Sequence, residues 1–136
     1  MRLRSTVLIL VTVVLFGIVA ANLAQTVTDG DRDNPVAKAK AEIRAIGSAL
    51  KLYRLDNMRF ASTEQGLIAL AHRPNDPHLT TWPEGGYLAR LPKDPWGRDY
   101  HYANPGRYGE IDIFTLGRDG RVGGEGLDAT IGNWNL

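Results

Sequence analysis

The side chains best suited to chemistry lie in a glycine-rich stretch near the C-terminus, residues 116–130. Asp119, Glu125 and Asp128 supply carboxylates there, and the repeated glycines let the backbone turn so that carbonyl groups converge. Calcium binds roughly six to eight oxygens of this mixed kind. The spacing does not match an EF-hand, so two interpretations stay open: a calcium site, or a glycine-rich surface turn with solvated acids.

Other candidate centres have simpler explanations. The three histidines are too scattered for a recognisable zinc pattern. Asp94 and Asp99 could pair as the carboxylates of a glycosidase, but Asp-Pro and Gly-Arg-Asp turns explain them more simply. Residues 117–126 lack the Gly-Lys-Ser/Thr ending of a phosphate-binding loop. We therefore expect a protein that is not an enzyme.

Composition narrows the classes of function further. The chain has 16 Lys and Arg against 15 Asp and Glu, so no basic field is available for a phosphate backbone and we expect no nucleic-acid partner. It has no cysteine, which excludes disulfides, thiol catalysis and zinc sites built on cysteine. A small exported domain without disulfides needs another source of stability, such as a bound metal or assembly into a polymer.

The N-terminal residues have the pattern of a membrane segment. Residues 5–28 carry no charge, and about 20 residues of helix cross a hydrocarbon core of ~30 Å. Arg2 and Arg4 favour a cytoplasmic amino terminus, which places the rest of the chain outside. Two interpretations stay open: a retained single-pass anchor over 1–28, or a secretory signal peptide cut after a small residue such as Ala21.

Residues 29–136 are expected to form one α+β head that begins with a helix. Asn34 and Pro35 are a helix start signal, and the pattern that follows predicts a helix over 36–56. Its apolar side chains recur at spacings of three and four, on one face of a helix. They are Ile43, Ile46, Leu50 and Tyr53.

A second, shorter helix and a small sheet are expected to follow. Ser62 and Gln65 have the capping-box spacing, which predicts a helix over 63–72. Beyond it, short apolar runs separated by Gly and Pro predict an antiparallel β-meander over 87–136 that includes the glycine-rich stretch. The strand candidates are 87–91, 99–103 and 111–115.

Several motifs of this head occur together in one family. They include LYRLDN at 52–57, STEQGL at 62–67, LPKDPWG at 91–97, GEIDI at 109–113 and IGNW at 131–134. The combined set, which runs from about residue 39 to the last residue, resembles the major (GspG-type) pseudopilins of the type II secretion system. No single motif would suffice for this resemblance.

The resemblance implies a fold and a role. Such proteins have a long N-terminal helix, embedded in the membrane over its first half, then a short helix and a small antiparallel sheet of the type IV pilin kind. The implied function is a structural subunit of a periplasmic pseudopilus that drives export of folded proteins from a Gram-negative bacterium. The implied partners are further copies of the chain, minor pseudopilins and an inner-membrane assembly platform. The alternative is a soluble or tethered periplasmic adaptor with the same head, released by signal-peptide cleavage.

The resemblance also implies one structural calcium in the glycine-rich stretch. Matched by position, its ligands are the carbonyls of Leu116 and Arg121, the carboxylate of Asp119, and groups around Thr130 and Gly132. The family usually has Asp where Thr130 stands. The loss of that carboxylate is expected to weaken the site unless Asp128 swings in.

The sequence departs from the family at the amino terminus. The family has a short leader ending in Gly, which a dedicated peptidase removes before it methylates the new amine, and a glutamate shortly afterwards. Arg4 stands at the position of that Gly, and Ile9 at the position of the glutamate. Three explanations stay open: a divergent paralogue that associates with a standard filament, a protein anchored without processing, or an altered terminus.

Overall fold

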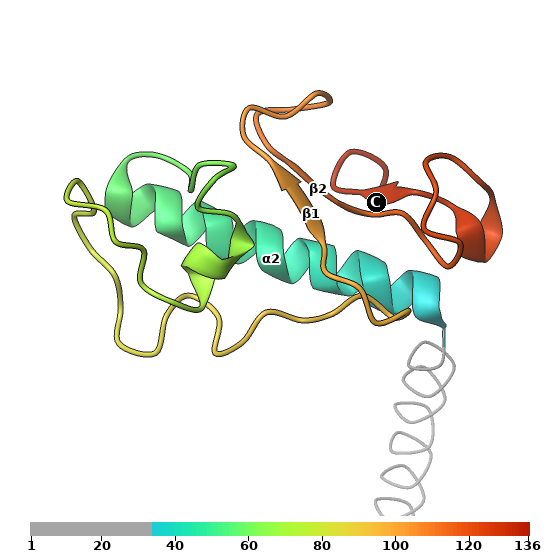
Figure 1. Ribbon diagram of the computed structural model, residues 1–136, viewed down its shortest axis with the longest axis horizontal. Coiled ribbons are helices and arrows are strands. Elements are labelled where there is room, and N and C mark those ends of the chain that lie inside the picture. The colour runs from blue at the N-terminus through green and yellow to red at the C-terminus, as the bar shows by residue number, and fades with distance from the viewer. Residues whose placement is uncertain (1–33) are drawn as a thin grey trace, which may run out of the picture. The chain divides into compact units, whose positions relative to one another are not determined.

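The computed structural model describes residues 34–136 (Figure 1). The expected membrane anchor over 1–28 lies outside these residues, as do Arg4 and Ile9. Among the helices of the described part, none combines the length and the apolar character needed to cross a bilayer.

A single long helix, α2 (Pro35–Asn57), supports the described head (Figure 1). Its buried residues are Ala39, Ile43, Ile46, Ala49, Leu50, Tyr53 and Asn57. Because these positions recur every three or four residues, they form one continuous face along the helix. The helix expected over 36–56 is thus observed with ends that differ by one residue.

A three-stranded antiparallel sheet packs against this helix. The strands lie in the order β1 (His101–Ala103), β2 (Asp112–Thr115) and β3 (Ile131–Gly132). The candidates at 99–103 and 111–115 therefore contain real strands with shorter bounds. A long helix followed by a small antiparallel sheet is the α+β class expected from the sequence.

The sheet contributes its own apolar side chains to the core. Ile113 on β2 is 1% exposed and Ile131 on β3 is 3% exposed, and both belong to the same cluster as the buried face of α2. Thr115 pairs with Ile131 across β2 and β3, and is itself completely buried. The two strands that flank the glycine-rich stretch are therefore fixed to the helix by packing.

The expected helix over 63–72 is wrong in extent and type, because the structure has a turn followed by a 3-10 helix, η1 (Leu67–Leu70). The capping box itself is present: the Gln65 N–H donates to Ser62 Oγ at 3.1 Å, and the Ser62 N–H donates to Gln65 Oε1 at 2.9 Å. Gly66 follows at once with φ of 65°, a conformation that interrupts a helix. The box therefore closes one turn instead of starting several.

The strand expected over 87–91 is also absent, so the described sheet begins at His101. The N–H groups of Tyr87 and Leu88 both donate to the carbonyl of Leu70, at 2.8 and 3.0 Å. Two successive donors that share one acceptor cannot form a ladder, in which alternate residues face the partner strand. This segment is held instead against the end of η1.

Candidate functional site

The glycine-rich loop (residues 116–130) connects β2 to β3 and closes on itself (Figure 1). Its first and last parts touch: the Arg118 N–H donates to the carbonyl of Leu127 at 2.8 Å, just within the short 3-10 helix η2 (Gly126–Asp128). Gly117 has φ of 73°, and a Cβ there would lie only 2.6 Å from the carbonyl oxygen of Ala129. Glycine is required at that crossing because a larger residue would push the two parts of the loop apart.

Two of the expected calcium ligands form hydrogen bonds within the loop. Asp119 Oδ1 accepts from the N–H of Arg121, two residues further on, at 3.0 Å. Thr130 Oγ1 accepts from the N–H of Gly123 at 2.9 Å, and the Thr130 N–H donates to the Gly123 carbonyl at 2.7 Å. These oxygens therefore already stabilise the turns on which they lie.

The third expected side-chain ligand, Asp128, forms a two-point ion pair with Arg118. Nε of Arg118 donates to Oδ1 of Asp128, and the terminal NH2 group donates to Oδ2, each at 2.9 Å. Both carboxylate oxygens are thus engaged by one planar guanidinium, the strongest form of this contact. The hydrogen bonds from Arg118 lower the pKa of the Asp128 carboxyl, and the same contact raises the pKa of Arg118.

A second guanidinium reaches the same loop from the segment before β1. Arg98 donates to the carbonyl of Gly117 at 2.7 Å and to the carbonyl of Arg118 at 2.8 Å. A Cβ on Gly120 would lie 3.2 Å from the central carbon of this guanidinium. The loop is therefore folded around the positive end of Arg98.

Arg98 is itself positioned by a buried carboxylate. Asp94 is 4% exposed, and its Oδ1 accepts from the N–H groups of Trp96 and Arg98 at 3.0 and 2.8 Å. Its other oxygen, Oδ2, accepts from the hydroxyl of Thr115 on β2 at 2.5 Å. Asp94 thus ties the turn that carries Arg98 to the strand that leads into the glycine-rich loop.

The residues as arranged do not fit a preformed calcium site. Among residues 34–136, no three His, Cys, Asp or Glu side chains gather in one place. Asp128 is held by Arg118, Thr130 offers a neutral hydroxyl, and Arg98 brings a positive charge to the carbonyls beside Leu116. Calcium needs several convergent anionic or carbonyl oxygens. Calcium binding through the expected ligands stays a prediction.

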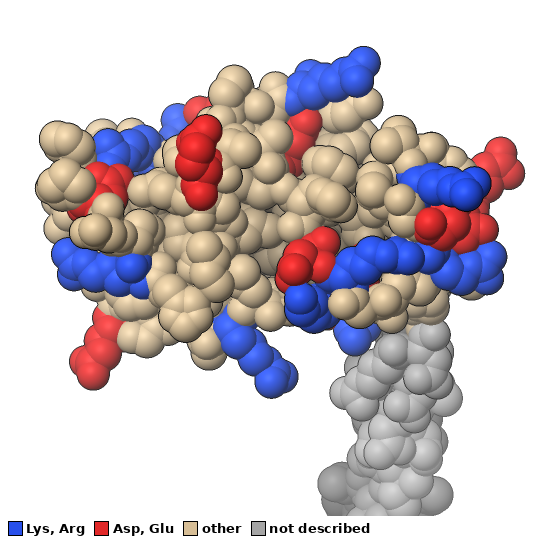
Figure 2. Space-filling model, in the orientation of Figure 1, with Lys and Arg blue, Asp and Glu red and all other residues tan. Residues whose placement is uncertain are grey.

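Sequence reasoning missed Arg98 and Arg118, because it looked for anionic ligands of a metal. The signal was available in part: Arg118 stands directly before Asp119, where a cation site is expected to exclude positive charge. Figure 2 shows Lys or Arg and Asp or Glu side chains next to one another on the visible face, and not a field of one sign. Inside the candidate site, arginine side chains bind the carbonyl and carboxylate oxygens of the loop.

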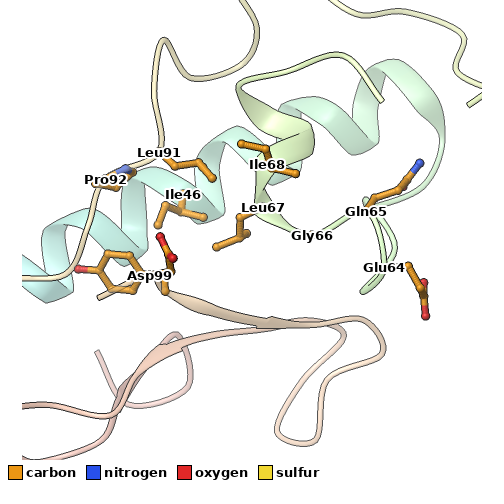
Figure 3. A pocket seen from close by; sticks show the side chains of 10 residues that line it. Ile46, Glu64, Gln65, Gly66, Leu67, Ile68, Leu91, Pro92 and Asp99 are labelled. Atoms are coloured by element: carbon orange, nitrogen blue, oxygen red, sulfur yellow. The ribbon is translucent and has the colours of Figure 1, made fainter. Parts of the chain in front are cut away.

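A separate pocket of about 390 Å³ lies between α2 and the segments around η1 and β1 (Figure 3). Its walls are mostly apolar and include Ile46 and Leu67. Its two acids, Glu64 and Asp99, lie at opposite ends in Figure 3, and Asp99 Oδ1 accepts from Lys93 Nζ at 2.7 Å. The glycosidase-like pairing considered for Asp94 and Asp99 is not formed either, because Asp94 is buried in its own hydrogen bonds.

Comparison with known proteins gives consistent matches over nearly the whole chain. Residues 26–134 match the family described as "Type II secretion system (T2SS), protein G". A type II secretion system core protein G of Vibrio cholerae is 47% identical over 128 residues, covering 94% of this chain and 88% of that protein. The core protein G of Pseudomonas aeruginosa is 45% identical over 128 residues, covering 93% and 90%.

A solved structure supports the same grouping. The crystal structure of the major pseudopilin from the type 2 secretion system of enterohaemorrhagic Escherichia coli superposes with a TM-score of 0.66 at 46% identity. The alignment covers 75% of this chain and 88% of that one. The family match over residues 26–134 takes in the glycine-rich loop.

Proposed function

The chain belongs to the type II secretion system protein G family and is a structural subunit of the pseudopilus, and we propose that it builds this filament from repeated copies of itself. The observation that carries the proposal is the family match over residues 26–134, which takes in nearly all of the described head. The protein acts by assembling with other pseudopilins, and no turnover of a substrate is needed for that role.

Assembly requires surfaces that contact neighbouring subunits, and one such surface lies at the end of α2. Leu52 and Leu55, three residues apart on α2, are 54% and 73% exposed, and Met58, which directly follows the helix, is 86% exposed. Side chains three apart on a helix lie on one side of it, so Leu52 and Leu55 form an exposed apolar stripe at the end of α2. We propose that this stripe contacts a neighbouring copy of the chain, since burial there removes apolar surface from water.

The absence of cysteine makes this contact easy to test. Leu55→Cys is introduced into the full chain, which is expressed in membranes together with its secretion system and treated with a bifunctional maleimide. The measurement is the fraction of cross-linked dimer on a denaturing gel. Val122→Cys, at a position 86% exposed in the glycine-rich loop, reports random collisions. A higher dimer yield at Leu55 supports the contact, and equal yields contradict it.

We propose that the chain is a single-pass inner-membrane protein whose C-terminal head lies in the periplasm, and that it assembles there on an inner-membrane platform. Family membership supports this location, and the uncharged run at 5–28 is long enough to serve as the anchor. Mass spectrometry of the mature amino-terminal peptide tests it. A peptide that retains the run supports the anchor, whereas a terminus near Asn22 supports the released adaptor.

We propose that any calcium binding to the glycine-rich loop is weak, with a Kd of about 10⁻³ M or higher. The carbonyls of Leu116 and Arg121, with Asp119 and Thr130, offer oxygens, but Asp128 contributes only by leaving Arg118. Isothermal titration calorimetry of the full chain with calcium chloride measures this directly. Micromolar affinity would contradict the proposal.

A further inference from the structure

The glycine-rich loop is gathered around two guanidinium groups that belong to the protein itself. Arg98 binds two successive carbonyl oxygens at the start of the loop, those of Gly117 and Arg118. Arg118 then binds the carboxylate of Asp128 near its end. Charge-assisted hydrogen bonds therefore cross the loop in series, from Arg98 to the backbone of Arg118 and from the side chain of Arg118 to Asp128.

These contacts have the same effect as a bound cation. A metal would draw carbonyl and carboxylate oxygens from both ends of the loop toward one positive centre. Here the positive centres are arginine side chains, whose planar donors bind a carboxylate or two carbonyls with defined geometry. The loop therefore contains its own cross-links between its first residues and its last.

The positive charge of these arginines also works against a divalent ion at the same place. Like charges a few ångströms apart repel each other, although solvent screens part of the repulsion here because the Arg118 side chain is 58% exposed. Thr130 gives no negative charge to offset it, and its hydroxyl is already bonded to the Gly123 N–H. The positive charge of the two arginines and the lack of a carboxylate at Thr130 both weaken the binding of calcium at this place.

We infer that Arg98 and Arg118 hold the glycine-rich loop closed in this protein, so that the folded loop does not depend on calcium. The inference uses family membership only to say where calcium is expected. It is independent of whether the exposed apolar stripe at Leu55 mediates assembly, because cross-linking there does not report on the loop.

The head also contains a suitable reporter for this question. All three tryptophans lie within the described part, and Trp134 is close to the loop, because it lines one pocket together with Leu116, Val122 and Thr130. Tryptophan fluorescence of the detergent-purified full chain therefore follows unfolding of the head, without removal of residues 1–33.

The first experiment uses the unaltered protein. Its melting temperature is measured with excess EDTA and with about 1 mM calcium, a concentration at or above the Kd of extracellular calcium modules. We expect the two melting temperatures to agree within about 3 °C, because a Kd of about 10⁻³ M or higher allows no larger shift at this concentration. A larger rise with calcium, reversed by EDTA, would overturn the inference, because tighter binding shifts stability further by mass action.

The second experiment removes one of the two internal cations, Arg118. Arg118→Ala is expected to lower the melting temperature by a few degrees in EDTA and to make it respond to calcium, because Asp128 is released. Arg118→Ala combined with Thr130→Asp, which adds the carboxylate, is expected to respond more strongly. The matched control is Arg121→Ala, an exposed arginine of the same loop whose backbone N–H, not its side chain, bonds Asp119. If Arg118→Ala melts like Arg121→Ala in EDTA, the arginine does not hold the loop and the inference is wrong.

Discussion

The buried face of α2 and the glycine-rich loop are stable for different physical reasons. On α2, Ile43 and Leu50 are completely buried, and their contribution comes from apolar area removed from water, which has no preferred direction. In the loop, most side chains are exposed, and its form depends on donors such as Arg118 meeting particular oxygens such as those of Asp128. The helix face tolerates any apolar side chain of suitable size, whereas the loop requires specific atoms at specific places.

The largest expected effect tests the helix side of this comparison. Leu50→Ala removes a side chain with 0% exposure from the face of α2 that packs on the rest of the head. We expect the free energy of unfolding to fall by about 2–5 kcal/mol, through lost transfer energy and the cavity that remains. Urea unfolding followed by tryptophan fluorescence measures the change.

Leu52→Ala is the matched control for that change. It is the same substitution two residues further along the same helix, but Leu52 is 54% exposed. A surface position away from packing should change stability by about 0.5 kcal/mol or less. If the two variants lose similar stability, burial on α2 does not explain the difference between the regions.

A slightly smaller effect is expected at Asp94, where directed hydrogen bonds are themselves buried. Asp94→Ala leaves the N–H groups of Trp96 and Arg98 and the hydroxyl of Thr115 without their acceptor. Each buried unsatisfied group costs about 1–3 kcal/mol, and relaxation toward solvent offsets part of the sum. We expect a loss of about 2–3 kcal/mol in the free energy of unfolding, measured in urea as for Leu50→Ala.

Asp99→Ala provides the comparison for Asp94. Its carboxylate is 78% exposed and forms one ion pair, with Lys93. Exposed pairs of this kind contribute about 0–1 kcal/mol. If Asp99→Ala and Asp94→Ala lower the free energy of unfolding equally, the burial of the hydrogen bonds to Asp94 has no special effect on stability. The loop would then not differ physically from an ordinary surface turn.

The same contrast explains what could be predicted from the sequence. The helix over 36–56 was predictable because its stability comes from a repeat of apolar residues such as Ile43, Ile46 and Leu50, and a repeat is visible in the sequence. Strands at 99–103 and 111–115 were predictable in the same way, from short apolar runs between turns. These features need only a pattern and not the identity of a partner.

The loop and its surroundings were less predictable because they depend on pairs distant in sequence. Arg98 meets the carbonyl of Gly117, 19 residues away, and no local pattern specifies that contact. The expected helix over 63–72 failed for a local reason, since Gly66 adopts positive φ directly after a correctly recognised capping box. β3 has only two residues, Ile131 and Gly132, too few to show an alternation.

The smallest expected effect is a pH dependence located in the loop. The hydrogen bonds from Arg118 lower the pKa of Asp128 in the folded protein relative to the unfolded chain. At pH values near 4, where an unperturbed Asp titrates, the unfolded state therefore binds more protons at this residue. The stabilisation is present above the unfolded pKa and is lost as the pH falls through the folded pKa.

The measurement that isolates this effect is the difference in melting temperature between the unaltered protein and Asp128→Asn, as a function of pH. Subtraction is necessary because other groups titrate in the same range; a backbone hydrogen bond from the His78 N–H lowers the pKa of Asp76 too. We expect the difference to be largest near pH 7 and to shrink toward zero below about pH 4. Glu110→Gln removes an exposed ion pair outside the loop, with Arg54, and gives the size of a general charge effect. A difference for Asp128→Asn that stays constant with pH would show that its carboxylate is not held by Arg118, and the loop would then need another source of closure.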